Sequence, residues 1–451
     1  MTTQINFNQI KGAEVNIFDF MSSAQIAEVQ STTYAQRTTE FVADAAFNSA
    51  VAAVAARLQV PPNAITAKDH GGKIVVPAGR YRLSTTIETQ YGITFIGEGP
   101  NVTQITFDGS GDCFYLGYHS VTDGRQPGCS MQDLSIELIA TTSTGIHLFS
   151  PTNASISNVG IGGPTAASTN TNVGIRIDGG NPTIGSAFLN LFSNLNLSTL
   201  HTGILVDSSN GQGATQNIFL DVACSGGFTS PSTGDTGSIG IHFYSGYDSL
   251  ILGGNLEHCK YGIFVDDSVG GANSPAITSY GTRWEACGYD IWLDPQIIRC
   301  KFIGSTTLDY SRINGILNSP TNIFDTGDGQ RQVGNVLSNV SPTDVYTITD
   351  NGSVFTMNGN VVTMFFDITF PSTAGKVQTC EVGYLPFKGV NNYTGVGFCN
   401  VISGATAATT YGVQVVPDSS TLNFYKDNTI ATAAAMTGCR IAGSVTYVAA
   451  D

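Results

Sequence analysis

Short apolar runs separated by turn residues fill most of this chain, and one early stretch departs from that pattern. The stretch runs from Glu40 to Leu58, reads EFVADAAFNSAVAAVAARL and is rich in alanine. Two prolines follow it and cannot continue a helix. The spacing therefore predicts one helix, whose apolar residues at helical spacing are Phe41, Ala45, Val51, Val54 and Leu58.

From residue 71 to residue 317 the chain repeats one short apolar motif. Its copies are TGIHLF (144–149), VGIRID (173–178), TGILVD (202–207), IGIHFY (239–244), YGIFVD (261–266) and YDIWLD (289–294). The motif glycines, with Asp290 in the sixth place, are 29, 29, 37, 22 and 28 residues apart. A second apolar run precedes each copy.

Repeats of this length that contain strands and turns, but no helix, are typical of a β-solenoid. One unit cannot bury its own apolar face, whereas units stacked about 4.8 Å apart share a continuous core. Leucine-rich repeats would show a Leu/Asn signature that is absent, and a propeller would need longer repeats of four strands. We therefore expect an all-β fold with a parallel β-helix over 71–317.

The pattern changes after this region. Residues 318–335 are polar and rich in turn residues, which predicts a linker. Strands continue over 336–451, and the segment from Val354 to Phe370 alternates on both sides of Asn358-Gly359-Asn360, which predicts a hairpin. We expect these strands to form a C-terminal β-sandwich. Its aromatic residues, which include Phe398, are expected to pack mainly in its core.

Composition narrows the classes of partner. Charged residues make up 12% of the chain, the net charge is −15 and the pI is near 4.6, which argues against nucleic acid and anionic membranes as partners. No apolar stretch is long enough to span a bilayer, and Met1 to Gln9 lacks the features of a secretory signal. The nine cysteines contain no CxxC and are expected to be buried free thiols. No motif indicates a metal or another cofactor.

One segment resembles a known family. Residues 71–107 contain Gly71-Gly72, an apolar strand, Pro77-Ala78-Gly79-Arg80-Tyr81 and a second strand that ends at Gly99. This order is similar to the first coils of pectate-lyase-like proteins. The resemblance implies a right-handed parallel β-helix whose N-terminal end is capped by the preceding helix. The segment NIFDF (16–20) resembles the opening strand of that family.

A β-helix with a capping helix before it and a separate β domain after it also resembles bacteriophage tailspikes. That resemblance implies a homotrimer, a place on the virion tail and coils that bind or cleave polysaccharide on the bacterial surface. The C-terminal β-sandwich would then lock the trimer or bind sugar. Residues 1–35 would then attach the protein to a tail or baseplate protein. Residues 36–70 would hold the capping helix and the lead-in to the coils.

The motif predicts two columns of outward side chains, because alternate positions of a strand face opposite sides. The column at the last motif position contains Phe149, Asp178, Asp207, Tyr244, Asp266 and Asp294. The other column contains His147, Arg176, Leu205, His242, Phe264 and Trp292. The aromatic members either pack in a subunit interface or under a loop, or form a platform on which sugar rings stack. The residues expected to bind substrate are Tyr244, Phe264, Arg283, Trp292 and Tyr310.

Four acidic residues are the candidates for catalysis. Glu257 and Glu285 align when the last two units are offset by 28 residues. Outward-facing carboxyls on adjacent coils would lie about 5 Å apart, the separation that retaining glycosidases use. The alternative is that these glutamates only bind turn amides or solvent. Asp266 and Asp294 are further candidates nearby.

Three functions remain open. The favoured one is a tailspike that hydrolyses bacterial polysaccharide. The second is a tailspike or fibre that binds polysaccharide without cleaving it. The third is a polysaccharide lyase, which is less favoured because a lyase needs cations near its acidic sugar and this chain has only 19 Lys and Arg residues.

Overall fold

The structure is a computed structural model, and it divides the chain into two compact units, Met1–Ile297 and Ile298–Asp451. The residues that it describes are 14–31, 41–57, 71–89, 92–117, 126–164, 170–179, 187–207, 213–226, 238–244, 246–266, 275–294, 296–305, 308, 312–314, 323–325, 349–351, 353–358, 361–372, 381–382, 385, 389, 395–404, 409–417, 421–427 and 429–448.

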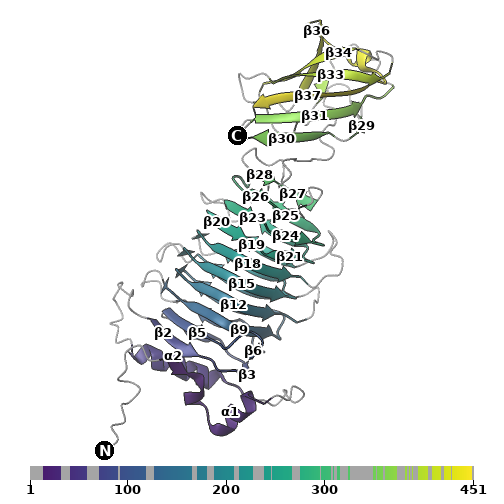
Figure 1. The fold of residues 1–451 in the computed structure, drawn as a ribbon. Helices are drawn as coiled ribbons and strands as arrows, with labels where there is room; N and C mark the ends of the chain where they lie inside the picture. Colours follow the sequence, from purple (N-terminus) through teal and green to yellow (C-terminus); the bar gives the residue numbers. More distant parts are fainter. Residues whose placement is uncertain are drawn as a thin grey trace, which may run out of the picture. The chain divides into compact units, whose positions relative to one another are not determined.

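The first unit is a stack of coils formed by parallel strands, with helices before it (Figure 1). The helical elements are η2 (Ile17–Phe20), α1 (Ser23–Val29) and α2 (Asp44–Arg57). One sheet, here called the long sheet, contains β1 (Val15–Asn16), β2 (Gly71–Val75), β3 (Gly79–Leu83), β5 (Gly92–Ile96), β6 (Thr103–Phe107), β9 (Ser130–Leu138), β12 (Ser155–Gly162), β15 (Leu191–Ser198), β18 (Ile218–Ser225), β20 (Ser249–Leu252), β21 (Asn255–Glu257), β23 (Ile277–Tyr280) and β24 (Arg283–Glu285).

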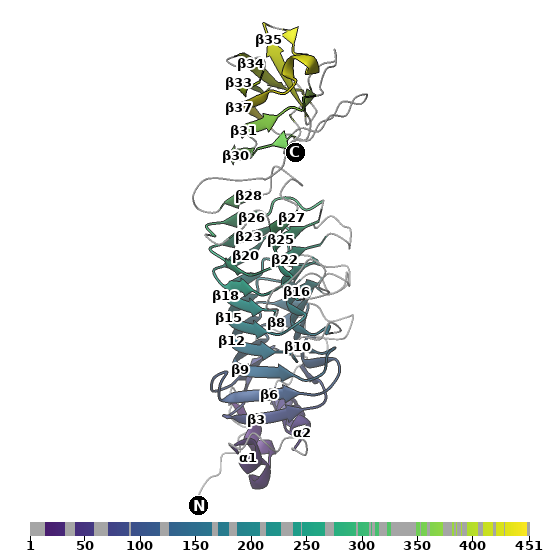
Figure 2. The ribbon, with the colours of Figure 1, turned by 90° about the vertical axis from the view of Figure 1, so that its right-hand side faces the viewer.

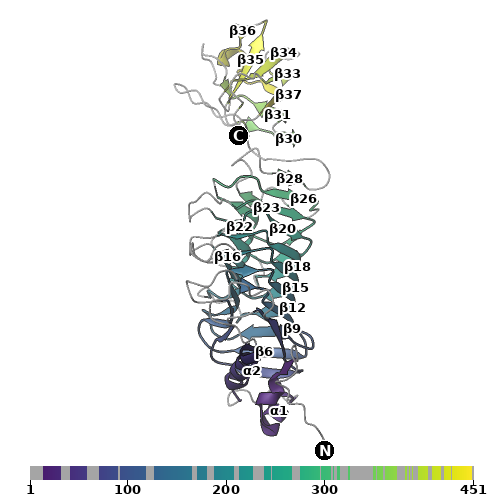
Figure 3. The ribbon, with the colours of Figure 1, turned by 90° about the vertical axis from the view of Figure 1, so that its left-hand side faces the viewer.

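The strands of the Gly-Ile motif form a second sheet, here called the repeat sheet. It contains β4 (Ile87–Thr89), β7 (Asp112–Leu116), β10 (Thr144–Phe149), β13 (Val173–Asp178), β16 (Thr202–Asp207), β19 (Ile239–Phe243), β22 (Tyr261–Val265) and β25 (Tyr289–Leu293). A short third sheet contains β8 (Gln126–Pro127), β11 (Pro151–Thr152), β14 (Ala187–Phe188) and β17 (Ala214–Thr215). The long sheet and the repeat sheet occupy two different sides of the coils (Figure 2; Figure 3). The predicted parallel β-helix is confirmed.

The motif residues explain why the coils stack. Ile204 and Val206 of β16 are fully buried, as are the equivalent residues of the neighbouring coils. The glycine before them is required because successive backbones approach closely there. A Cβ on Gly203 would lie 2.6 Å from the carbonyl oxygen of Gly240, and a Cβ on Gly174 would lie 2.6 Å from that of Gly203. The repeat glycines are therefore packing positions.

A residue with left-handed backbone bends each of the long-sheet strands β9, β12, β15 and β18 in its middle. These residues are Asp133, Asn158, Asn194 and Asp221, with φ values between 52° and 59°. Asn and Asp tolerate this conformation better than other non-glycine residues. The side-chain amide of Asn158 donates to Asp133, and that of Asn194 donates to Asn158, at 2.6 and 3.0 Å. The bend divides the outer face of the long sheet into two strips.

The helix α2 packs on the first coils, as the capping prediction requires. Its Phe47 is fully buried and lies edge-on to Tyr81 and Phe114, with ring centroids 5.7 and 6.2 Å apart. The predicted buried face is wrong in part, because Ala45 is exposed and the buried residues are Ala43, Ala46, Phe47, Ala50 and Val54.

One further N-terminal expectation needs correction, and one N-terminal helix was not predicted. The segment 16–20 is not a strand, since only Val15–Asn16 pairs with β2 and the following residues form η2. The helix α1 was not predicted, although its capping box is visible in the sequence as Ser22 and Gln25. The hydrophobic pattern that predicted the coils therefore did not predict these short N-terminal elements.

The second unit contains a nine-stranded antiparallel sheet. Its elements are β29 (Thr349–Asp350), β30 (Val354–Asn358), β31 (Val361–Thr369), β32 (Glu381–Val382), β33 (Val396–Ser403), β34 (Thr410–Val415), β35 (Leu422–Lys426), β36 (Thr429–Ile430), β37 (Arg440–Val448) and the short helix η6 (Ala433–Met436). The same unit also contains β26 (Lys301–Ile303), β27 (Ile313–Asn314) and β28 (Ile323–Asp325).

The predicted hairpin is confirmed, because β30 pairs with β31 and Asn358 lies opposite Val361. The sheet also curls onto itself. Phe366 of β31 and Phe424 of β35 lie several strands apart in the sheet order, yet their ring centroids are 6.1 Å apart. The two ends of the sheet thus enclose one core, which gives the layered arrangement expected of a sandwich. Phe398 is not part of that core, because it is 73% exposed.

All eight described cysteines are buried free thiols, as expected. No helix in the described part of the chain is long and apolar enough to cross a membrane.

Candidate functional site

The strand register confirms both predicted columns on the outer face of the repeat sheet. In the first, each member pairs with the next along His147, Arg176, Leu205, His242, Phe264 and Trp292. In the second, Phe149, Asp178 and Asp207 are in register. Backbone hydrogen bonds from the amides of Tyr244, Asp266 and Asp294 to the preceding coil extend that ladder. The columns therefore cross the coils from β10 to β25.

Aromatic rings gather at the C-terminal end of these columns. The rings of His242 and Phe264 are stacked with centroids 4.7 Å apart, and Phe264 stacks on Tyr261 at 5.1 Å. Trp292 lies edge-on to Tyr261 and Tyr289, at 5.3 and 4.8 Å. Phe264, Trp292 and both tyrosines are half-buried. They present partly exposed flat apolar faces with polar edges, a surface suited to sugar rings.

Three carboxylates surround one phenol beside this aromatic cluster. Burial raises the pKa of Tyr244, and the negative charges of Asp266, Asp207 and Asp294 raise it further. Asp266 is 8% exposed and lies 3.8 Å from Nε2 of His242. Asp294 accepts a hydrogen bond from Nε1 of Trp292 at 3.2 Å. Because they follow β22 and β25, Asp266 and Asp294 occupy adjacent coils, whose backbones are about 4.8 Å apart.

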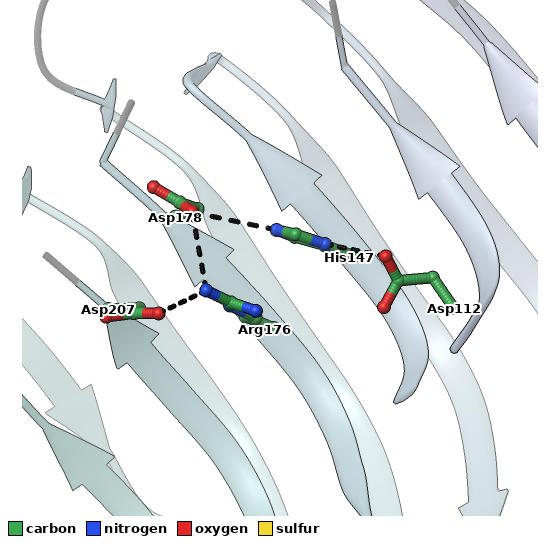
Figure 4. A network of polar contacts seen from close by, with 5 residues as sticks. All are labelled: Asp112, His147, Arg176, Asp178 and Asp207. Atoms are coloured by element: carbon green, nitrogen blue, oxygen red, sulfur yellow. Dashed lines mark hydrogen bonds and ion pairs between the residues drawn. The ribbon is translucent and has the colours of Figure 1, made fainter. Parts of the chain in front are cut away.

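A second polar cluster occupies the N-terminal part of the same face (Figure 4). Nδ1 of His147 lies 2.8 Å from Asp112, and Nε2 lies 3.8 Å from Asp178. Arg176 continues the chain of contacts, at 3.6 Å from Asp178 and 2.6 Å from Asp207 (Figure 4). Burial alone would lower the pKa of His147, but its contacts with Asp112 and Asp178 outweigh burial and raise that pKa.

Tyr115 completes this cluster, since its ring lies edge-on to His147 with centroids 4.8 Å apart. Burial, followed by the charges of Asp178 and Asp112, raises the pKa of Tyr115 well above its usual value. Sequence reasoning missed Tyr115 and Asp112, because β7 reads DCFYL and lacks the Gly-Ile motif. The apolar run after the 71–107 segment was the signal that could have placed them on an earlier coil.

The predicted glutamate pair lies on the other sheet. Glu257 and Glu285 are in register on β21 and β24, so their predicted stacking on adjacent coils is confirmed. Each has a partner on its own strand: Nδ2 of Asn255 donates to Glu257 at 2.9 Å, and Arg283 lies 2.7 Å from Glu285. These contacts resemble the alternative in which the glutamates serve only structure and solvation.

The structure does not bring all of the predicted site residues together. The glutamates end β21 and β24, and Arg283 begins β24. Asp266 and Asp294 follow the next repeat-sheet strands. The full length of β22 or β25, roughly 13 Å, separates the two sets. Tyr244, Phe264 and Trp292 share the face of the aspartates, and Tyr310 lies outside the described residues.

Comparison with known proteins agrees with the coil architecture. The model of the family described as rhamnogalacturonase A/epimerase, pectate lyase-like, matches residues 40–270. The chain belongs to this family. The resemblance seen in residues 71–107 is thereby confirmed. No curated protein sequence matches the chain.

Several solved structures are similar to this chain at low sequence identity. One is ORF18 of Geobacillus virus E2, with 12% identity, 93% of this chain and 78% of that chain covered, and a TM-score of 0.46. The tailspike protein of Acinetobacter phage vB_ApiP_P1 shows 13% identity, coverage of 98% and 88%, and a TM-score of 0.40. The A-module of the Azotobacter vinelandii mannuronan C-5 epimerase AlgE6 shows 14% identity, coverage of 64% and 76%, and a TM-score of 0.39.

Proposed function

We propose that this protein is a phage tailspike that binds bacterial surface polysaccharide along the outer face of the repeat sheet and hydrolyses it. One observation carries the proposal: the aromatic cluster and the stacked carboxylates share the same coils. Phe264 lies in β22 and Asp266 directly follows that strand, and Trp292 and Asp294 are placed in the same way at β25. A sugar ring on the aromatic faces would thus lie beside two carboxyls.

The spacing of the two aspartates suits retaining hydrolysis. In that reaction one carboxyl protonates the leaving oxygen while the other attacks the anomeric carbon, and water then cleaves the glycosyl-enzyme. The two carboxyls must lie about 5 Å apart, close to the spacing of adjacent coils. We assign the attack to Asp294, because the hydrogen bond that it accepts from Trp292 stabilises its ionised form. Asp266 is then the proton donor.

The test is to incubate the purified protein with polysaccharide from the host strain and to size the product. Hydrolysis shortens the chains and creates reducing ends without an unsaturated uronate. Chains that keep their length but co-sediment with the protein would identify a tailspike or fibre that only binds. If the protein neither binds the polysaccharide nor shortens it, the proposal is wrong.

The second cluster favours elimination as the alternative chemistry. A lyase needs a base for the proton next to the uronate carboxylate and a cation that stabilises the resulting anion. Tyr115, His147 and Arg176 place such groups together on the repeat sheet. Products that absorb in the ultraviolet as unsaturated uronates would support this function over hydrolysis.

We also propose a homotrimer, in which the second unit contributes to assembly. The outer face of its sheet exposes large apolar side chains on β31 and β33, namely Val361, Phe365, Val396, Phe398 and Ile402. Phe365 and Phe398 both pair with Ser444, so they flank the same residue of β37. Such a patch is typical of an interaction surface. A Phe398→Asp variant with the mass of a monomer in analytical ultracentrifugation would support this role, and an unchanged trimer would contradict it.

We also propose a place on the virion tail, on the ground of the resemblance to bacteriophage tailspikes. Residues 1–35 would attach to a tail or baseplate protein, and the coils would meet the host surface. Immunogold labelling of virions would test it, with label at the tail tip as the expected result.

A further inference from the structure

The outer face of the long sheet contains a groove on coils that precede the glutamate pair, with β18 between its last strand and β21. The groove has a volume of about 520 Å³ and crosses β6, β9, β12 and β15. It follows the strip between the bend residues and the strand ends. Four coils span about 14 Å in the stacking direction.

The floor of this groove consists of two glycines. Gly160 and Gly162 occupy successive outward positions of β12, where the neighbouring coils carry side chains. In the same two columns β9 carries Ser135 and Glu137, and β15 carries Asn196 and Ser198. The hollow therefore results from two missing side chains.

Neither glycine is required by the fold. Glycine inside a strand weakens it and usually marks a bulge, a close backbone or a close ligand. The register of β12 is regular on both sides of these positions, so there is no bulge. A Cβ on Gly160 would lie 3.5 Å from Ser135, and one on Gly162 would lie 3.7 Å from Ser198, which are ordinary contacts. The repeat glycines differ, since a Cβ there would lie within 2.5–2.8 Å of the next coil's carbonyl oxygen. The remaining explanation is a ligand that approaches the sheet.

The lining indicates the chemistry of that ligand. It is mainly polar and includes the amides of Gln104, Asn194 and Asn196, a group that can both donate and accept hydrogen bonds. Asn158 also lines the groove, but its amide bonds to Asp133 and Asn194. One cation and one anion, Arg80 and Glu137, balance each other. Among the residues that the structure describes, no aromatic ring lines the groove. The backbone here is already paired in the parallel ladder, so an extended peptide cannot add as a strand.

We infer that this groove is a second carbohydrate site, which binds a neutral, hydroxyl-rich segment of polysaccharide through hydrogen bonds. It rests on the proposed function only in that the ligand is a glycan. Without stacking, one such site binds weakly. On a long polysaccharide held also by the repeat sheet, the second contact becomes intramolecular and prolongs attachment.

The test fills the hollow rather than removing a contact. The variant Gly160→Val/Gly162→Val places two branched side chains where the structure has room for them. The matched control is Ala223→Val/Ser225→Val, in the same two columns on β18. Both pairs are made in a Trp292→Ala background, so that the aromatic cluster contributes little. Circular dichroism and thermal unfolding verify that each variant folds.

The probes are neutral hexasaccharides of glucose, galactose, rhamnose and N-acetylglucosamine, with hexagalacturonate as the anionic comparison. Binding is measured by saturation-transfer NMR titration. We expect at least one neutral probe to bind. The glycine double variant should bind it about tenfold more weakly, because the valine side chains occupy the space of the ligand and prevent about two of its hydrogen bonds with the lining. The control pair should bind the probe as tightly as the Trp292→Ala protein without further changes.

Three results would overturn the inference: no neutral probe binds, the glycine variant binds as well as the control, or hexagalacturonate is preferred. These outcomes are separate from the proposed function. Cleavage at Asp266 and Asp294 can fail while the groove binds, and the groove can fail while cleavage of short oligosaccharides is unchanged.

Discussion

The outer faces of the repeat sheet and of the long sheet are formed by the same coils, yet their ionisable side chains differ in exposure to water. On the repeat sheet several ionisable side chains are buried, with Asp178 at 1%, His147 at 7% and Asp266 at 8% exposure. On the long sheet the corresponding acids are open, and the side chain of Glu285 is 45% exposed beside an Arg283 that is 60% exposed. Electrostatic interactions are much stronger where water is excluded. On this ground we propose that catalysis belongs to the aspartates of the repeat sheet rather than to the glutamate pair.

The largest expected effect separates the two carboxylate pairs. Asp266→Asn or Asp294→Asn should lower the rate of polysaccharide cleavage on the order of 10³-fold, because each removes an acid or nucleophile from the reaction. Glu257→Gln and Glu285→Gln should leave the rate within about twofold. Reducing-end assays on the four purified variants measure this. If the glutamate variants lose activity and the aspartate variants keep it, the long sheet carries the catalysis.

A second expected effect separates the two kinds of glycine. Gly203→Ala should lower the free energy of unfolding by about 2 kcal/mol, since its Cβ would overlap the carbonyl oxygen of Gly240 at 2.6 Å and the sulfur of Cys224 at 2.8 Å. Gly160→Ala should be neutral or stabilise by about 0.5 kcal/mol, because alanine has fewer unfolded conformations. Urea unfolding of both variants decides. Equal destabilisation would contradict the view that Gly160 is free of packing constraints.

A third effect compares two half-exposed aromatic residues. Trp292→Ala should weaken binding of a host oligosaccharide by about 1 kcal/mol, through loss of a stacking surface. Tyr280→Ala is the control, since Tyr280 is 44% exposed on the long sheet. Calorimetric titration should show a change for Trp292 only. A similar loss for both would indicate that exposed aromatic area, rather than position, determines binding.

The smallest expected effect is a pH dependence of stability. Contacts with Asp112 and Asp178 raise the folded-state pKa of His147 against the effect of burial. The resulting stabilisation is complete below the unfolded pKa of about 6.5 and disappears as the pH rises through the folded pKa. Urea midpoints should therefore fall over this range in the native protein and fall less in His147→Gln. If the urea midpoints of the two proteins change with pH in parallel, the protonated imidazole of His147 does not contribute to stability.

Sequence patterns predicted the coils well because each coil repeats the same physical problem. The Gly-Ile spacing identified the buried positions, and alternation then placed Trp292 and Asp294 in neighbouring outward columns, as the register confirms. The patterns were weaker where one residue type has two uses. Alanine favours helix on any face, so the buried side of α2 was only partly predicted. The β7 strand, which supplies Asp112 and Tyr115, lacks the motif glycine and was not aligned.

The division of the acids between two faces was also beyond the pattern. Glu285 and Asp294 are nine positions apart. Glu285 is the last residue of β24, and Asp294 directly follows β25. Only the turn between β24 and β25 determines that they face different sides of the coil. Residue Ala286 in that turn has a φ of 50°, a conformation rare for alanine that its sequence context does not indicate.

The central claim is that polysaccharide occupies the aromatic and acidic end of the repeat sheet. A crystal structure of the Asp266→Asn/Asp294→Asn variant with an uncleaved fragment of the host polysaccharide tests it most directly. The expected result is a sugar ring on Phe264 or Trp292, with its glycosidic oxygen within hydrogen-bond distance of residue 266. A fragment bound beside Glu257 and Glu285, with the repeat sheet empty, would contradict it.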